Sequence, residues 1–209
     1  MARKASSFAR PPARFRPQPR ILILCEDRKS CLTYLQEAAQ HFRCQADVEV
    51  AHVGRTDPVG IVTEAKKRRA DYDRVYCAID RDSHLSFDDA SSRAGKAPAV
   101  EIIASHPCYE FWLLLHFRKT RSPFAPSGSR SAADNVTSAL RKEDGMSSYS
   151  KGGTEGLFRA LLGRLPNARS HSTQVLADAV SDGNMNPSTR MHVLIDLFES
   201  LGKPLPLEA

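Results

Sequence analysis

Residues 75–82 read Val-Tyr-Cys-Ala-Ile-Asp-Arg-Asp, an apolar run that ends in two aspartates one residue apart. The β-branched and aromatic residues of this run predict a buried strand. Because side chains alternate along a strand, we expect Asp80 and Asp82 on the same face, where both can reach one ion.

A second apolar run, Ile-Leu-Ile-Leu-Cys at residues 21–25, ends in the same way, with Glu26 and Asp27. Uninterrupted apolar runs are typical of central strands in a parallel sheet, because such strands are buried on both faces. Open α/β sheets bind their ligands beyond the carboxyl ends of the strands. Both acidic clusters are therefore expected where a ligand would lie.

The rest of the chain supports an α/β fold. Strand patterns at 21–25, 48–53, 75–80 and 100–105 alternate with helical patterns at 30–42, 57–70, 86–96 and 107–117, and the start of the second helix is indicated by Asp57 followed by Pro58. This alternation predicts a mainly parallel four-stranded sheet with helices on both faces.

Beyond residue 131 the pattern predicts helices only, at about 131–143, 154–164, 171–182 and 188–201, and residues 186–189 read as the start of the last one. We therefore expect a disordered basic tail at 1–20, an α/β domain at 21–117 and a helical C-terminal region at 118–209.

The net charge of +6 is located in the first 20 residues, which contain six basic residues and no acid. Clustered arginines bind nucleic-acid phosphates by displacing counterions, so Arg10, Arg14, Arg16 and Arg20 are candidates for a nucleic-acid-binding arm. The alternative interpretation is a solubilising terminus without a partner.

No apolar run approaches the ~18 residues of a membrane span, and the basic tail lacks the apolar centre of a signal peptide. We expect a soluble, cytoplasmic protein that does not bind membranes. The five cysteines contain no Cys-x-x-Cys pair, which favours reduced core thiols over a zinc site or a disulfide framework.

The strand order 2-1-3-4 would place Glu26 about 5 Å from Asp80, the spacing of neighbouring strands. Carboxylates that converge in this way repel one another unless a cation neutralises them, and Mg²⁺ or Mn²⁺ suits oxygen ligands. Such metals activate water in phosphodiester hydrolysis.

Two alternatives stay open. Acidic residues often follow strands because turns favour Asp. A receiver-type phosphoacceptor also carries acids after its first and third strands, although this chain lacks a fifth strand that ends in Lys.

An acidic residue after the first strand and Asp-x-Asp after the third resemble the Toprim domain of topoisomerases, primases and related nucleases. More closely, the chain resembles RloB-like proteins, which are prokaryotic, have a Toprim-like core and are encoded with restriction and anti-phage defence systems. The segments that carry this resemblance are Cys25-Glu26, residues 78–82, Ser-His-Pro-Cys-Tyr-Glu-Phe-Trp-Leu-Leu-Leu-His-Phe at 105–117, Tyr149-Ser150-Lys151 and residues 186–189.

The resemblance implies that Asp80 and Asp82 bind the metal and that Glu26 is a third ligand or a general acid or base. Asp27 stands where the family often has Gly, and it adds a fourth carboxylate. Glu110 is a further candidate ligand, with pairing to an Arg or His as the alternative.

Two cations near these acids have separate expected roles. Lys151 is a candidate phosphate contact. Arg81 is expected on the opposite face from its two neighbouring aspartates, in a salt bridge.

The resemblance thus implies a Mg²⁺-dependent Toprim-type nuclease in anti-phage defence, with RNA such as tRNA favoured over DNA and with a partner defence protein such as an ATPase. The rival interpretation is a non-catalytic subunit that binds nucleic acid or acts in signalling.

Overall fold

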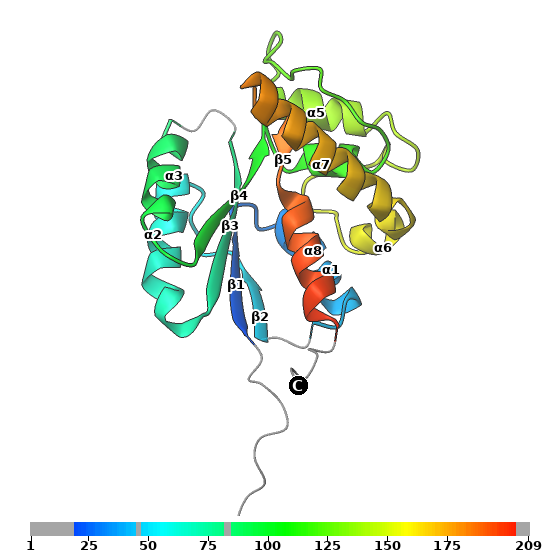
Figure 1. The fold of residues 1–209 in the computed structure, drawn as a ribbon. Coiled ribbons are helices and arrows are strands. Elements are labelled where there is room, and N and C mark those ends of the chain that lie inside the picture. Colours follow the sequence, from blue (N-terminus) through cyan, green and yellow to red (C-terminus); the bar gives the residue numbers. More distant parts are fainter. Residues whose placement is uncertain (1–18, 45–46, 82–84, 204–209) are drawn as a thin grey trace, which may run out of the picture.

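A computed structural model of the chain describes residues 19–44, 47–81 and 85–203. Its strands form one sheet in the order β2-β1-β3-β4-β5 (Figure 1). The central strands are β1 (Arg20–Cys25) and β3 (Arg74–Asp80), flanked by β2 (Asp47–Ala51) and β4 (Val100–His106). These four strands are parallel, so the predicted strand order and direction are confirmed.

Helices cover both faces of the sheet. On one side lie α2 (Pro58–Arg68) and α3 (Phe87–Gly95), and on the other lie α1 (Cys31–His41) and α8 (Met191–Leu201) (Figure 1). The predicted start of α2 is confirmed, since the Asp57 carboxylate accepts the Gly60 N–H at 2.6 Å and Pro58 occupies the first turn. The central strands β1 and β3 are buried on both faces between these two layers, which explains their long apolar runs.

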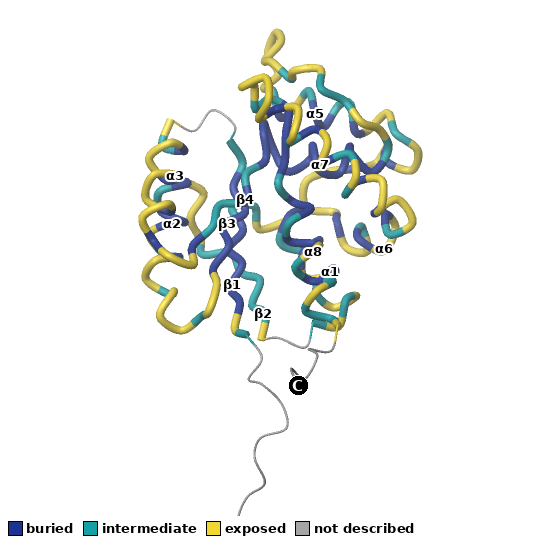
Figure 2. Tube along the Cα trace, viewed as in Figure 1, coloured by how far each residue is buried: buried dark blue, intermediate teal, exposed yellow. Residues whose placement is uncertain are grey.

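The C-terminal region packs on the same core as the strands. It contains α5 (Ala132–Leu140), α6 (Leu157–Leu161) and α7 (Leu165–Asp182), and the 3₁₀ turn η3 (Leu162–Arg164) joins α6 to α7. Helices α5 and α7 pack on the short α4 (Glu110–Leu114), and α6 packs on α1. A second 3₁₀ turn, η2 (Arg69–Asp71), follows α2. One apolar cluster runs from β1 and α1 through α4 to α5, α7 and α8, and Figure 2 shows buried residues in each labelled element of this set. Trp112 is fully buried in it, so α4 anchors the helical region to the sheet.

A fifth strand, β5 (Ser188–Thr189), was not predicted, and the prediction of a helix start at residues 186–189 is wrong. After α7 the chain returns to the open edge of β4, where Thr189 pairs antiparallel with Ser105 and their hydroxyl oxygens lie 2.9 Å apart. An open strand edge has unpaired N–H and C=O groups, and β5 satisfies some of them. Only then does α8 begin, at Met191.

The described part of the chain contains no helix with the length and apolar character needed to cross a membrane. The five cysteines are free thiols.

Candidate functional site

Two acidic residues meet where β1 and β3 end. Glu26 follows β1, and its N–H donates to the Ala78 carbonyl oxygen at 3.0 Å, which extends the pairing of the two strands. Asp80 is the last residue of β3, and its N–H donates to Glu26 Oε2 at 2.9 Å. The sheet therefore brings Glu26 and Asp80 together at its carboxyl edge, as the strand order requires.

The Asp27 carboxylate is held by the start of α1. Its Oδ1 accepts the Lys29 N–H at 2.9 Å, and its Oδ2 accepts the N–H groups of Ser30 at 2.6 Å and Cys31 at 3.1 Å. The first N–H groups of a helix have no partner within the helix, so Asp27 acts as its cap. Asp27 therefore fixes the turn that carries Glu26 from β1 into α1.

Glu110 reaches the site from α4. Its side chain is 1% exposed, and Oε1 accepts a hydrogen bond from the Tyr149 hydroxyl at 3.1 Å and lies 3.4 Å from Lys151 Nζ. Its second oxygen, Oε2, is buried and has no hydrogen-bond partner among the residues that the structure describes. The alternative interpretation of Glu110, pairing with an Arg or His, is wrong in its partner, because the cation beside Glu110 is Lys151.

The sequence did not indicate a role for Tyr149, which is buried beside Glu110. Burial and the charge of Glu110 raise the pKa of the Tyr149 phenol, so it stays neutral and donates its proton to the carboxylate. Tyr149 precedes Lys151 by two residues in a loop. Nothing in that spacing predicts that both side chains face a helix that lies 39 residues earlier.

The carboxyl edge carries more negative than positive charge. Burial raises the pKa of Asp80 well above its ordinary value, the negative charges of Glu110 and Glu26 raise it further, and Lys151 partly offsets them. Partial burial lowers the pKa of Lys151, but the charges of Glu110 and Asp80 outweigh this and raise it overall. The half-exposed lysine is therefore positively charged, and one cation faces several carboxylates.

A small cavity lies at this edge. It has a volume of about 10 Å³ and is lined by Glu26, Asp27, Asp80 and Ser105, among others. That volume suits one water-sized occupant. The polar groups around it are mainly carboxylate oxygens, which favour a hard cation or a water as the occupant.

Arg81, which follows Asp80, and His116, which lies in the core, both have structural partners. Arg81 Nη1 lies 2.8 Å from Asp88 Oδ1, which confirms the predicted salt bridge, and its guanidinium lies 4.6 Å from the centre of the Phe87 ring. His116 Nε2 lies 3.1 Å from the Tyr34 hydroxyl in the core, and burial lowers the pKa of His116 to about 4. These side chains support the fold around the site.

Comparison with known families identifies the family of this chain. The family model described as RloB-like protein matches residues 21–198. The chain belongs to the RloB-like protein family. The match includes the strands that carry Glu26 and Asp80 as well as the loop that carries Lys151. No curated protein and no solved structure matches the chain.

The donor chemistry of this RloB-like site fits Mg²⁺, which is often held by one or two carboxylates and keeps several waters. Glu26 and Asp80 supply two carboxylates, and the partnerless oxygen of Glu110 shows how incompletely the negative charge is satisfied. No group of three or more His, Cys, Asp or Glu within residues 19–44, 47–81 and 85–203 has the arrangement of a complete metal site. Asp82, the predicted partner of Asp80, lies outside the described residues.

The predicted nucleic-acid-binding arm is only partly described. Arg10, Arg14 and Arg16 lie outside the described residues, whereas Arg20 begins β1. Arg20 Nε donates to Asp47 Oδ2 at 3.2 Å, and its guanidinium lies 5.1 Å from the centre of the Tyr72 ring. Arg20 is thus at the amino end of the strand whose carboxyl end leads to Glu26, so the tail joins the fold at the edge opposite the acidic cluster.

Proposed function

We propose that this RloB-like chain is a metal-dependent nuclease whose centre is formed by Glu26, Asp80 and Asp82. The observation that supports the proposal most strongly is the contact of Glu26 Oε2 with the Asp80 N–H at 2.9 Å. This contact joins two strand ends into one acidic cluster at the edge where parallel α/β sheets bind ligands.

The side chains have distinct roles in this proposal. Asp80 and Glu26 hold Mg²⁺ or Mn²⁺, and Asp82 completes the set. The metal, when bound, polarises the phosphate and lowers the pKa of a bound water. Glu110 lies behind this set, fixed by Tyr149 and Lys151.

Lys151 supplies a positive charge on a side chain that can contact either Glu110 or the substrate. Its side chain is 51% exposed, so it can turn from Glu110 to a phosphate oxygen of the substrate. A phosphate that approaches a cluster of carboxylates needs such a cation, because the carboxylates repel it.

The substrate class follows from the family resemblance. We propose RNA, tRNA in particular, ahead of DNA, and a role in anti-phage defence together with a partner protein such as an ATPase. The basic tail would then bind the nucleic acid electrostatically.

Incubation of the purified chain with tRNA, single-stranded RNA or plasmid DNA, in Mg²⁺, Mn²⁺ or EDTA, tests the activity. We expect cleavage that requires the divalent metal and is lost in Asp80→Asn, which keeps the size and backbone contacts of Asp80. The matched control is Asp178→Asn, because Asp178 is an exposed acid on α7.

Cleavage that persists at the wild-type rate in Asp80→Asn would contradict the proposal. Nucleic-acid binding without cleavage in any metal, together with weaker binding after removal of residues 1–20, would favour the rival function, a non-catalytic subunit that binds nucleic acid.

A further inference from the structure

A second, larger cavity begins next to the acidic cluster. It has a volume of about 550 Å³, and its lining includes Arg81, Pro107, Phe124, Pro126 and Arg130. Cavities of roughly 300–1,000 Å³ are the usual size for small organic ligands. This cavity therefore has room for a group far larger than the water or metal ion that the small cavity can hold.

The two cavities are linked by consecutive residues at the end of β3. Asp80 and Ser105 line the small cavity, and Arg81 directly follows Asp80. The Arg81 N–H donates to the Ser105 carbonyl oxygen at 2.8 Å, so the pairing of β3 with β4 continues as far as Arg81. A ligand that spans both would have one part at the carboxylates and the next part in the large cavity.

Phe124 is held rigidly at this cavity. The Phe124 N–H donates to Asn186 Oδ1 at 3.2 Å, and Asn186 Nδ2 donates to the Phe124 carbonyl oxygen at 2.7 Å. The ring packs edge-to-face on Phe111, with ring centres 6.2 Å apart. Fixed aromatic rings of this kind are the surfaces on which proteins stack unpaired bases.

Arg130 supplies positive charge at the same cavity. It belongs to a tight turn in which the N–H groups of Ser127 and Arg130 each donate to the carbonyl oxygen of the other residue, at 3.0 and 3.1 Å. Its side chain is exposed and forms no salt bridge with another described residue. Arg81, by contrast, is already paired with Asp88. Arg130 is therefore the cation that can contact a phosphate or stack on a base.

We propose that the large cavity binds an unpaired nucleobase of the nucleic-acid strand, next to the phosphate that lies at the acidic cluster. This inference rests on the proposed function and deepens it, since it makes single-stranded segments the substrate class. A paired base cannot enter the cavity, because its edge and both its faces are occupied in the duplex. Phe124 stacks on the base, and Arg130 contacts the backbone beside it.

The test measures binding rather than cleavage. An eight-nucleotide single-stranded RNA and the same RNA annealed to its complement are titrated, in EDTA, with the full chain carrying Asp80→Asn. This background excludes cleavage and reduces the negative charge at the edge. Phe124→Ala is then added, and Phe117→Ala is the matched control because it removes a half-buried phenylalanine that packs under Arg164.

We expect Phe124→Ala to weaken binding of the single strand by about tenfold and to change binding of the duplex by less than about twofold. Phe117→Ala should leave both affinities within about twofold. Arg130→Met, at an exposed position that does not endanger folding, should weaken single-strand binding by about threefold and reduce its salt dependence.

Three results would overturn the inference: no binding of the single strand, equal losses for single strand and duplex in Phe124→Ala, or no loss for the single strand. These results differ from a failure of the proposed function, which is absence of metal-dependent cleavage. A base cavity without cleavage would still give the tenfold loss, and cleavage without a base cavity would leave Phe124→Ala at the affinity of its background.

Discussion

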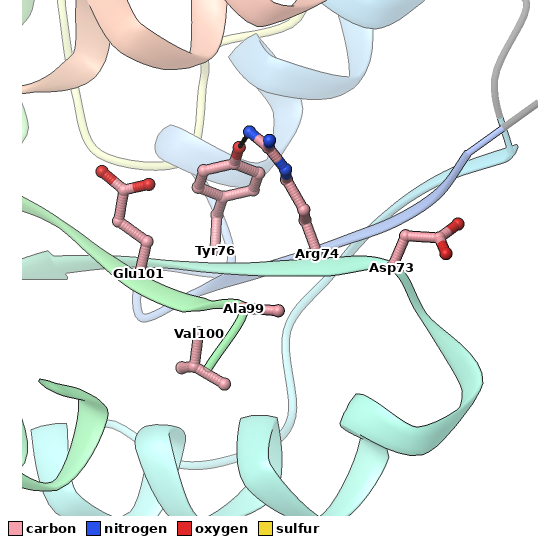
Figure 3. Close-up of a pocket in the computed structure, with 6 residues that line it drawn as sticks. All are labelled: Asp73, Arg74, Tyr76, Ala99, Val100 and Glu101. Atoms are coloured by element: carbon pink, nitrogen blue, oxygen red, sulfur yellow. Dashed lines mark hydrogen bonds between the residues drawn. The ribbon is translucent and has the colours of Figure 1, made fainter. Parts of the chain in front are cut away.

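The two edges of the sheet both carry charged residues and cavities, but they differ in how the charges are balanced. At the amino edge, a cavity of about 500 Å³ is lined by Asp73, Arg74, Tyr76 and Glu101, among others (Figure 3). Asp73 accepts the Arg20 N–H at 2.7 Å, and Glu101 forms an ion pair with Arg190. Each carboxylate of this cavity therefore has a donor or a cation of its own.

The carboxyl edge gathers more carboxylates around its cation, although Glu26, Asp27 and Glu110 each accept at least one hydrogen bond there. Four carboxylates, those of Glu26, Asp27, Asp80 and Glu110, converge there, and Lys151 is the cation that offsets them. At the amino edge, Figure 3 shows the Arg74 guanidinium directed at the Tyr76 hydroxyl, to which it donates at 3.5 Å. Cavity size alone therefore does not identify the functional site, since the amino-edge cavity is far larger than the small cavity among the carboxylates. Unsatisfied charge, which destabilises a fold, is the better sign of a functional site.

The strongest test of this comparison replaces one glutamate at each edge. Glu26→Gln keeps an oxygen that can accept the Asp80 N–H but removes a charge from the proposed centre, so cleavage should fall by at least about 1,000-fold, or about 4 kcal/mol. Glu101→Gln removes a charge from a half-exposed ion pair and should change cleavage by less than about twofold. Initial rates of RNA cleavage measure both effects, and similar losses for the two variants would show that the edges do not differ.

Low pH should destabilise the apolar core that lies between the two edges. Burial lowers the pKa of His116 to about 4, whereas an unfolded histidine has a pKa of about 6.5. Between these values the unfolded chain binds a proton that the folded chain does not, so stability falls as the pH falls from about 6.5 to about 4, by on the order of 3 kcal/mol. Above pH 6.5 this contribution is fully present.

Urea unfolding over this pH range measures that loss. In His116→Gln, whose amide does not titrate, the free energy of unfolding should depend less steeply on pH than in the wild type. Equal slopes would mean that His116 does not contribute to the pH dependence of the free energy of unfolding. Glu101→Gln should leave the contribution of His116 to this slope unchanged, because His116 contacts Tyr34 and Trp112 in the core.

The smallest expected effect is at the amino edge. Arg190 Nη1 donates to the Ile102 carbonyl oxygen at 2.7 Å and its other amino group pairs with Glu101, so Arg190→Met should lower the free energy of unfolding by about 1 kcal/mol. Thermal or urea unfolding measures this change. The rate of cleavage should not change in this variant. A loss of cleavage greater than the loss of stability explains would mean that the amino edge takes part in the reaction.

Much of this architecture could be predicted because buried parallel strands appear in the sequence as apolar runs. The runs at 21–25 and 75–79 are apolar throughout, and the acids that follow them had to meet once β1 and β3 were neighbours. The two-residue strand β5 is too short to give such a pattern. Its pairing depends on the path of the chain after α7 rather than on any periodicity.

The sequence predicted that these acids lie close together, but it did not predict the hydrogen-bond partners of each one. The spacing of Asp27 does not reveal that its carboxylate faces the N–H groups of α1. The partner of Glu110 comes from a loop about 40 residues further along the chain, and no local pattern connects α4 with that loop. Tertiary packing decides such contacts, so sequence periodicity cannot indicate them.

The central claim is that the unbalanced carboxylates form a cation site, and thermal unfolding with and without Mg²⁺ tests it most directly. Ligand at 100 times its dissociation constant stabilises a folded protein by about 2.7 kcal/mol, so Mg²⁺ should raise the Tm of the wild type by roughly 5–10 °C. The shift should be below about 1 °C in Asp80→Asn and unchanged in Asp178→Asn. An equal shift in wild type and Asp80→Asn, or none in the wild type, would contradict the claim.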